Sequence, residues 1–353
     1  MMPVRNEASF LSRSLGSVLA QDYPHSRLEV LIADGKSTDG TRSEIERLAA
    51  DSHIPVTVFD NPGQIVPTGL NGALGRACGD VIVRVDGHTV LAPDYVRQRV
   101  SVLARSGADN VGGLMNAVSE TPFGQAVALA TSSPFGVGGA RFHYSDREES
   151  VDTVYMGCWP RAVFERIGLF DEEMVRNQDD ELNYRLRAAG GRILLSPKIR
   201  SRYYNRTTLR SLWRQYFQYG FWKVRVMQKH PRQMRPRQFV PPAFVAYLPG
   251  ATLVAVLTAL RWLPLALGAG AYLGANIAVS VWTARRRNWR ALPLLMVAFA
   301  TLHLSYGLGF LIGLARFAGR WRDRTTRGTL TSLSGKPAPV TESPLRSPEE
   351  SIN

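Results

Sequence analysis

Two apolar runs in the first part of the chain each end in an acidic residue. Leu28 to Ala33 leads into Asp34, and Val81 to Val85 leads into Asp86. Largely apolar runs of this length are typical of strands that are buried on both faces of a parallel sheet. Ligands bind such sheets beyond the carboxyl ends of the strands, so Asp34 and Asp86 stand where a binding site is expected.

The rest of this region alternates between helical and extended patterns. We predict helices at Thr41–Ala50, Ala92–Ser106, Ala162–Ile167 and Asp180–Ala189, the last closed by Gly190-Gly191, and strands at Val56–Phe59 and Val151–Trp159. Thr121 to Tyr144 is rich in Gly, Ser and other small residues and is predicted to be a flexible loop. Strands that alternate with helices indicate an α/β fold with a mostly parallel sheet flanked by helices.

The chain changes character after Thr208. Leu209 to Met227 mixes aromatic with basic side chains, which is typical of a helix lying at the headgroup level of a membrane. Three apolar segments follow, each long enough to span a bilayer: Ala243 to Leu260, Leu263 to Ala284 and Ala291 to Ala315. The alternative, buried helices of a soluble domain, is disfavoured by their length and number. We therefore predict interfacial and transmembrane helices in the C-terminal part.

The basic residues around these segments bear on their membrane topology. Clusters precede the first segment, separate the second from the third at Arg285-Arg286-Arg287, and follow the third. Because these clusters cannot all be cytoplasmic if every segment crosses, we expect a tight hairpin of the first two segments and a third that is re-entrant or departs from the positive-inside rule. The predicted division of the chain is an α/β domain at 1–205, an interfacial region at 206–238, membrane helices at 239–316 and a disordered polar tail at 317–353.

Charge narrows the choice of partners. The formal net charge of the 353-residue chain is +14, and no Asp or Glu occurs between Leu182 and Arg322. This excess implies anionic partners. Because the charges flank long apolar runs, they fit the headgroups of anionic lipids better than nucleic acid. We therefore expect a membrane partner and no nucleic acid.

The cysteines and the start of the chain indicate the compartment. Cys78 and Cys158 lie far apart and fall in no metal-ligand spacing, which favours a reducing environment. The start of the chain lacks the apolar core of a secretory signal, so we expect the α/β domain to be cytoplasmic. A parallel domain normally has a buried strand ahead of Pro3, where only Met1 and Met2 stand, so we also expect a truncated first strand.

Four motifs carry residues suited to nucleotide-sugar chemistry. They are Pro3-Val4-Arg5-Asn6-Glu7, Asp34-Gly35-Lys36-Ser37-Thr38-Asp39-Gly40-Thr41, Asp86-Gly87-His88 and Gln178-Asp179-Asp180-Glu181-Leu182. In this order the motifs resemble those of the family 2 inverting glycosyltransferases, which have the GT-A fold. The resemblance covers Pro3 to Lys223. It is closest to the bacterial succinoglycan-biosynthesis glucosyltransferase group, in Asp60-Asn61-Pro62, Ile65 to Asn71, Asp109 to Gly113, Ser133 to Gly138 and Asn177 to Asn183.

The segment that follows Asp34 suits a nucleotide. A carboxylate at a strand end can accept a hydrogen bond from a nucleobase or a ribose hydroxyl. The other interpretation, in which Asp39 caps the helix that begins at Thr41, is compatible with it. The resemblance implies a nucleotide-binding set of Pro3, Asn6, Glu7, Asp34, Asn71 and Asp86.

Asp86-Gly87-His88 stands where the resembling family has an Asp-x-Asp metal motif, with His in place of the last acid. Asp and His both ligate Mn²⁺ or Mg²⁺, and the nitrogen ligand favours Mn²⁺. A divalent cation neutralises the charge that develops on a diphosphate leaving group. We therefore predict a metal site at Asp86 and His88. The alternative is that His88 is only polar surface.

The acidic run is the candidate for proton transfer. Inverting transfer requires a carboxylate that accepts the proton of the attacking hydroxyl. The resemblance places Asp179 on this base, with Asp180 as the rival and Glu181 as an acceptor-side partner. Clustered carboxylates raise one another's pKa, which suits a base. The alternative is a charged helix start that offsets the macrodipole.

Further polar residues are candidates for contacts with the acceptor or the diphosphate. These are Gln178, Arg206, Arg214 and Lys223. Solvated surface is an equally good interpretation of the three basic residues. The segment from Arg214 to Tyr219 weakly resembles the Gln-x-x-Arg-Trp motif of processive synthases but lacks its Arg, so we expect addition of a single sugar.

The resemblance implies transfer of a hexose from a nucleotide sugar, with UDP-glucose the expected donor, to a saccharide linked to polyprenyl diphosphate. The reaction would serve exopolysaccharide or cell-surface glycan biosynthesis at the cytoplasmic face of the bacterial inner membrane. Two alternatives stay open: transfer directly to polyprenyl phosphate, as dolichyl-phosphate mannose synthases do, and a non-catalytic membrane scaffold. A nicotinamide-dependent oxidoreductase is disfavoured because no Gly-x-Gly-x-x-Gly follows a strand.

Overall fold

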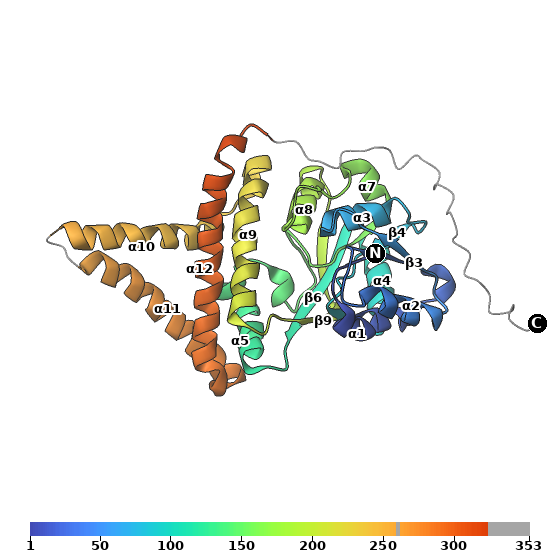
Figure 1. The fold of residues 1–353 in the computed structure, drawn as a ribbon, viewed down its shortest axis with the longest axis horizontal. Coiled ribbons are helices and arrows are strands. Elements are labelled where there is room, and N and C mark those ends of the chain that lie inside the picture. Colours follow the sequence, from blue (N-terminus) through green and yellow to red (C-terminus); the bar gives the residue numbers. More distant parts are fainter. Residues whose placement is uncertain (259–261, 324–353) are drawn as a thin grey trace, which may run out of the picture.

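The computed structural model describes residues 1–258 and 262–323 (Figure 1). Its amino-terminal sheet is parallel and consists of β1 (Met2–Val4), β2 (Val30–Asp34) and β3 (Val56–Asp60), in that spatial order. A strand is thus present at the start of the described chain, where three residues pair with β2.

A second sheet continues the first. Its strands lie in the order β4 (Val81–Val83), β8 (Cys158–Pro160), β6 (Asn110–Val118), β9 (Ile193–Tyr204) and β5 (Thr89–Leu91), and β7 (Glu149–Ser150) pairs with β9. The Met1 amino group donates to the Val83 carbonyl and the Val85 amide donates to the Met1 carbonyl, which joins β1 to β4. The predicted parallel arrangement holds for β1 to β3, whereas β8 runs antiparallel to both β4 and β6, so the whole sheet is mixed.

Helices cover both faces of the sheet and bury its alternating side chains. Ile32 of β2 packs with α1 (Ala8–Leu19) and α2 (Thr41–Ala50), whereas its neighbour Leu31 packs with α3 (Val66–Leu74). Complete burial of a Leu or Ile side chain contributes about 1.5–3 kcal/mol. The remaining helices of this domain are α4 (Tyr95–Ser106), α7 (Ala162–Ile167) and α8 (Gln178–Ala188). The four predicted helices are confirmed: α2 and α7 keep their predicted bounds, and the ends of α4 and α8 shift slightly.

The prediction of a flexible loop from Thr121 to Tyr144 is wrong. This segment contains α5 (Pro122–Thr131) and α6 (Pro134–Val137). Each helix begins with a proline after a capping hydroxyl, because Thr121 accepts from the Gly124 amide and Ser133 accepts from the Phe135 amide. The small residues serve close packing here. The strand predicted at Val151–Trp159 is also reduced, to β8.

Two long helices run side by side between the α/β domain and the remaining helices. They are α9 (Leu209–Lys229) and α12 (Leu292–Arg316), and Figure 1 shows them nearly parallel. A Cβ added at Gly309 would collide with the Phe217 carbonyl, so glycine permits this close approach of the two backbones. The helix predicted to be interfacial is therefore buried along much of one side, although Trp213 is exposed.

Three helices are long and apolar enough to cross a membrane by length and composition. The spans are Pro236–Leu257, Leu263–Arg287 and Trp289–Arg316, and they contain α10 (Val240–Leu257), α11 (Leu263–Arg287) and α12. In Figure 1, α10 and α11 project away from the α/β domain, and the most apolar stretch of each helix is mostly exposed. The most apolar stretch of α12 is more than half buried against the rest of the protein.

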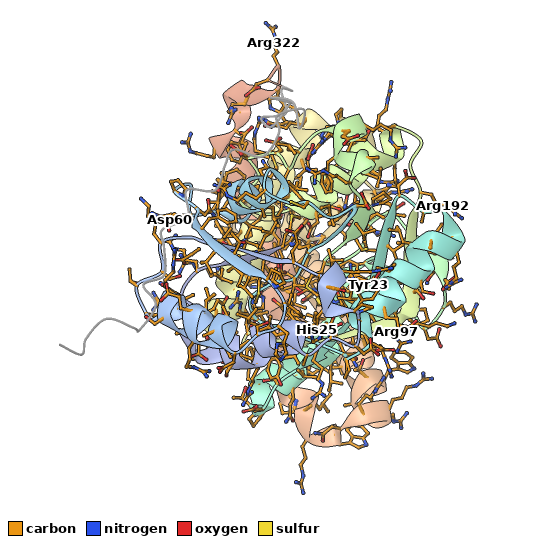
Figure 2. The ribbon with its side chains drawn as sticks, turned by 90° about the vertical axis from the view of Figure 1, so that its right-hand side faces the viewer. Tyr23, His25, Asp60, Arg97, Arg192 and Arg322 are labelled. Carbon is orange, nitrogen blue, oxygen red and sulfur yellow. The ribbon has the colours of Figure 1, made fainter. Side chains whose placement is uncertain are left out.

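Short 3₁₀ helices complete the described chain. They lie at His25–Arg27, Arg141–His143, Pro231–Gln233, Pro236–Phe239, Trp289–Ala291 and Ala318–Arg320. The last one falls within the region predicted as a polar tail, and residues 324–353 of that region lie outside the described residues. Viewed from the α/β domain (Figure 2), Asp60 at the end of β3 and Arg192 ahead of β9 lie at opposite margins of the domain.

Candidate active site

A cleft of about 1470 Å³ opens beyond the carboxyl ends of β1 and β4. Segments far apart in the sequence line it, and most of the predicted site residues meet there. They are Pro3, Asn6, Glu7, Asp86, His88, Gln178, Asp179, Asp180, Arg206, Arg214 and Lys223. Asp34, Asn71 and Glu181 do not line the cleft, although Gly35, the neighbour of Asp34, does.

The end of the cleft at which we predicted a nucleotide is built by the first motif and the loop after β2. The side-chain oxygen of Asn6 accepts a hydrogen bond from the Thr38 backbone amide at 2.8 Å. The backbone amide of Asn6 donates to the Ser37 hydroxyl at 2.9 Å. Asp34 is buried and accepts from the same hydroxyl at 2.6 Å. Asp34 thus orders the loop that forms the wall of the cleft.

Two residues of the second motif carry out the predicted capping. Asp39 accepts hydrogen bonds from the amide and the hydroxyl of Thr41 at 3.1 and 2.6 Å. These hydrogen bonds lower the pKa of Asp39. The carboxylate therefore stabilises the start of α2 rather than contacting the cleft.

Asn71, which we predicted to bind the nucleotide, lies outside the cleft and contacts other parts of the domain. Its side-chain amide donates to the Phe170 carbonyl and accepts from the Phe170 amide, both at 2.9 Å. It also donates to Glu172 at 3.0 Å. Because these contacts use both ends of the amide, Asn71 fastens α3 to the loop that precedes α8.

The predicted metal residues lie in the cleft with Glu7 nearby. His88 Nδ1 lies 3.4 Å from the Glu7 carboxylate, and its imidazole ring meets the Tyr203 ring edge-on at 5.0 Å. Among the described residues, no three His, Cys, Asp or Glu side chains converge as a metal site. A Mg²⁺ or Mn²⁺ ion commonly takes one or two protein ligands and completes its shell with substrate phosphates and water. Asp86 and His88 fit that smaller set.

Arg84 connects the predicted metal residue with the predicted base. It is almost fully buried, and its guanidinium lies 2.8 Å from Asp86 Oδ1 and in contact with Asp179 Oδ1. Burial alone would lower the pKa of Arg84, but the two carboxylates raise it above its usual value. Our sequence analysis missed this residue. The signal was an arginine inside an apolar strand segment, two positions before Asp86 and hence on the same side of the strand.

The Asp179 carboxylate has the electrostatics of a base that works near neutral pH. Burial raises its pKa to about 6, and the negative charge of Asp86 acts in the same direction against the positive charge of Arg84. Only its Oδ1 atom contacts Arg84. Its other oxygen is thus able to accept a proton in the cleft.

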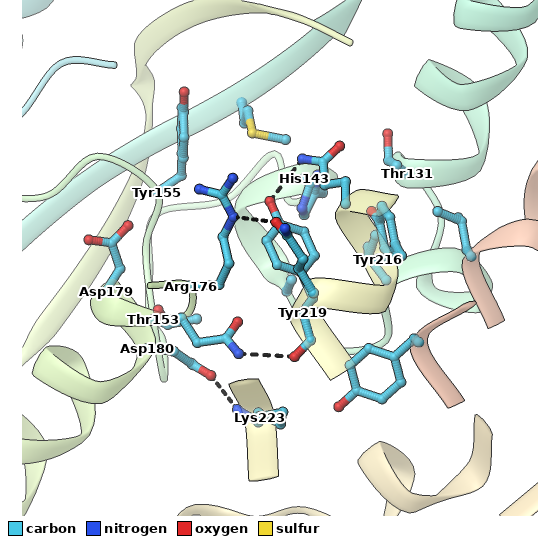
Figure 3. A pocket seen from close by; sticks show the side chains of 18 of the residues that line it. Thr131, His143, Thr153, Tyr155, Arg176, Asp179, Asp180, Tyr216, Tyr219 and Lys223 are labelled. Carbon is cyan, nitrogen blue, oxygen red and sulfur yellow. Dashed lines mark hydrogen bonds and ion pairs between the residues drawn. The ribbon is translucent and has the colours of Figure 1, made fainter. Parts of the chain in front are cut away.

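The rival acid, Asp180, is held by a lysine. Figure 3 shows Asp180 directed toward Lys223 of α9, and the two side chains form a short ion pair. Lys223 is buried. Lys223 therefore pairs with Asp180, whereas our sequence analysis expected it to contact a diphosphate. Asp179 is then the acid that lies toward the predicted metal residue Asp86, through Arg84.

The prediction that Glu181 works beside the base is not supported by its position. The side chain is completely buried and pairs with Arg185 at 2.7 Å and with His230 at 2.9 Å. Arg185 and His230 hold the pKa of Glu181 below its usual value in spite of its burial. Glu181 therefore joins α8 to the end of α9.

The arginines predicted to contact the acceptor or the diphosphate stand free at the cleft. Arg206 and Arg214 are exposed, line the cleft and form no ion pair within the part of the chain that the structure describes. Arg176, which our sequence analysis missed, also lines the cleft and donates to Gln218 at 3.0 Å (Figure 3). The backbone of Asn177 is left-handed (φ 63°), and its side-chain Nδ2 group donates to the Tyr219 carbonyl. The start of α8 is thus held against α9.

Comparison with known proteins identifies the family. The model of the family described as glycosyl transferase family 2 matches residues 1–167. The succinoglycan biosynthesis protein ExoA of Rhizobium meliloti (strain 1021) is 33% identical over 313 residues, which cover 88% of this chain and 92% of that protein. The chain belongs to glycosyl transferase family 2. As a member of this family with these relatives, it is a glycosyltransferase of glycan biosynthesis.

Two further similarities agree with family 2. A Methanococcus voltae protein, named dolichyl N-acetyl-alpha-D-glucosaminyl phosphate 3-beta-D-2,3-diacetamido-2,3-dideoxy-beta-D-glucuronosyltransferase, is 27% identical over 65% of this chain and 73% of its own length. The mannosyltransferase PcManGT of Pyrobaculum calidifontis, solved with GDP-Man and Mn²⁺, superposes with a TM-score of 0.55 at 21% identity, over 85% of each chain. This likeness confirms the GT-A fold.

A buried ionic network ties the family 2 domain to the end of α9. Lys229 contacts both Asp171 and Glu173, and Arg225 pairs with Glu173 at 2.9 Å. Burial would raise the pKa of Glu173, but its cationic partners lower it to about 2. Arg320, which follows α12, contacts the same carboxylate at 2.5 Å. The catalytic domain is therefore locked to both long helices by charge pairs.

Proposed function

We propose that this family 2 glycosyltransferase moves a hexose, with inversion, from a nucleoside diphosphate sugar to a saccharide carried on polyprenyl diphosphate. UDP-glucose is the expected donor, and exopolysaccharide or cell-surface glycan the expected product. The observation that carries the proposal is a single cleft that contains both the predicted base and the predicted metal residues. In this cleft Arg84 pairs with both Asp179 and Asp86, and the lining continues onto the apolar helices.

Asp179 is the proposed base. The acceptor hydroxyl oxygen forms a bond to the anomeric carbon, and its proton passes to the free oxygen of Asp179. The bond between the anomeric carbon and the diphosphate oxygen breaks on the opposite face, and the nucleoside diphosphate leaves with the electron pair. A pKa of about 6 keeps Asp179 largely ionised at neutral pH and able to accept the proton.

Asp86 and His88 are the proposed ligands of a divalent cation, Mn²⁺ or Mg²⁺. The metal would neutralise the charge of the departing diphosphate. The structural relative PcManGT was solved with GDP-Man and Mn²⁺, which supports a metal-dependent donor site. Pro3, Asn6 and Glu7 form the neighbouring wall, where the nucleotide is proposed to bind.

A lipid-linked acceptor is supported by the relatives and by the apolar helices. One relative's name refers to a dolichyl-linked sugar phosphate, and another's refers to synthesis of succinoglycan. We propose that the exposed pair α10 and α11 inserts into the bacterial inner membrane, with α12 lying against the cytoplasmic catalytic domain. This arrangement agrees with a hairpin of the first two apolar segments.

The proposal is tested with native membranes that contain the full chain, radiolabelled UDP-glucose and extracted lipid-linked saccharides. The Asp179→Asn variant is expected to lose about 10²–10⁴-fold in kcat with an unchanged amount of protein. Mass spectrometry of the lipid product separates the two acceptor classes, because transfer to polyprenyl phosphate yields a monosaccharide on a single phosphate. Equal turnover by Asp179→Asn and wild type would overturn the assignment of the base, and absence of any sugar transfer by wild type would favour a non-catalytic scaffold.

A further inference from the structure

The cavity that contains Asp179 does not end at the catalytic acids. Its lining continues onto three helices of the C-terminal region, through Val240, Pro241 and Phe244 of α10, Gly268 and Tyr272 of α11, and Leu302, His303 and Tyr306 of α12. A single cavity thus connects the site of chemistry with the helices that are apolar enough for a membrane.

The far end of this cavity suits an apolar chain. The rings of Phe244 and Tyr272 stack at 4.5 Å between α10 and α11. Two polar side chains of this end are hydrogen-bonded within the protein, because His303 bonds both the Phe135 carbonyl at 2.8 Å and the Tyr272 hydroxyl at 3.0 Å. The outer surface of both helices is also apolar, with exposed Val256 and Leu267 among others.

One arginine stands where the catalytic part of the cavity meets the apolar part. Arg237 lines the cavity three residues before Val240, the first cavity-lining residue of α10. Arg235, two residues earlier, also lines the cavity and pairs with Asp152 at 3.1 Å. Arg237 is exposed and has no ion pair within the described part of the chain.

The Arg237 guanidinium packs against a glycine pair. A Cβ added at Gly139 would collide with three atoms of that guanidinium, so the group lies directly on the backbone. Gly138 has a left-handed φ of 62°, and the Arg237 Cδ atom lies 3.7 Å from the position of its added Cβ. A planar guanidinium is suited to bind two oxygens of one phosphate, and glycine at 139 leaves room for it at this position.

We propose that Arg237, lying on Gly138 and Gly139, binds the phosphate group of the lipid-linked acceptor, and that the acceptor's isoprenoid chain runs along α10 and α11. The proposal rests on the proposed function, because it assumes that the acceptor is a polyprenyl phosphate ester. Charge complementarity favours this occupant. Arg237 is a cation without an ion-pair partner in the described chain, and it lies between a polar catalytic cleft and an apolar passage. A lipid-linked saccharide has the matching order of groups: a polar sugar, an anionic phosphate and an apolar isoprenoid chain.

The kinetic test compares Arg237→Gln, Arg237→Lys and Gly139→Ala in the full chain, with the exposed Arg232→Gln as the matched control. Arg237→Gln is expected to raise the KM for the lipid-linked acceptor about 10–100-fold while the KM for UDP-glucose changes less than about twofold. Gly139→Ala displaces the guanidinium and is expected to act in the same direction, and Arg237→Lys to recover part of the affinity. An unchanged acceptor KM in Arg237→Gln, or an equal rise in both KM values, overturns the proposal.

A binding test separates failure of this site from failure of the proposed function. Wild type is expected to bind undecaprenyl diphosphate in detergent micelles at least about tenfold more tightly than undecaprenol, which lacks phosphate. Arg237→Gln is expected to abolish that difference, and Arg232→Gln to preserve it. If wild type transfers no sugar to a lipid but shows this difference, the phosphate site stands and the proposed reaction fails. If wild type binds both lipids equally, the site itself is refuted.

Discussion

The guanidinium of Arg84 contacts the carboxylate of Asp179 across 95 positions of the sequence. This relationship makes the proposed base dependent on a residue of the strand region that also carries the proposed metal site. Arg84 has a second carboxylate partner in Asp86, so it sets the distance and the charge balance between the two acids.

Replacing Arg84 with Gln is expected to move the acid limb of the pH–activity profile upward. Arg84 opposes the burial that raises the pKa of Asp179 to about 6, so its removal raises that pKa further. The deprotonated base is then available only at higher pH. The measurement is kcat/KM against pH, with Arg97→Gln, an exposed arginine paired with Asp22, as the control. An acid limb at the wild-type position would contradict the role given to Arg84.

Replacing His88 with Asp is expected to shift the metal preference. The nitrogen ligand favours Mn²⁺, whereas a second carboxylate favours Mg²⁺, so the ratio of Mg²⁺-supported to Mn²⁺-supported activity should rise. The assay adds each metal to protein that has been stripped with EDTA, and EDTA alone should remove activity. An unaltered ratio would indicate that His88 is no ligand.

Replacing Lys229 with Met is expected to destabilise the protein by about 3–5 kcal/mol, because it removes a buried cation from two buried carboxylates. The readout is the melting temperature in detergent together with the rate of proteolysis. Arg97→Met removes an exposed ion pair and should leave the melting temperature nearly unchanged. Equal effects of the two substitutions would argue against a structural role for the network.

The stability that Glu173 contributes is expected to depend on pH. Its pKa is lowered from the ordinary value of 4.5 to about 2 by Arg225 and Lys229, so its contribution is fully present above pH 4.5 and is lost as the pH falls toward 2. Thermal unfolding of wild type and Glu173→Gln should therefore differ most above pH 4.5 and converge below it. A constant difference across this range would refute the assignment.

The parts of this molecule that could be predicted from the sequence are those that local pattern determines. Thr41–Ala50 was predicted with its exact bounds because its apolar spacing and its capping residues are adjacent in the chain. Asp86 and Asp179 were placed in one site by the resemblance to family 2 glycosyltransferases, and both line the same cleft.

Tertiary contacts decided what could not be predicted. Glu181 follows the proposed base by two positions, but the face of α8 on which it lies turns it into the protein toward Arg185 and His230. The Thr121–Tyr144 segment has the composition of a loop, and burial against α12 adds to its two helix caps in making α5 and α6 helical. Arg84 was missed because one of its two partners, Asp179, lies 95 positions further along the chain.

The charge network around Glu173 determines where the chain can be shortened without loss of stability. A fragment cut after β9 would keep Asp171, Glu173 and Asp180 but lose Lys229, Arg225 and Lys223. Its carboxylates would then lose their cationic partners, and the surface that α9 covers would be exposed to solvent. The glycosyltransferase domain is therefore expected to need α9 for its stability, and a fragment that ends after β9 is expected to fold poorly.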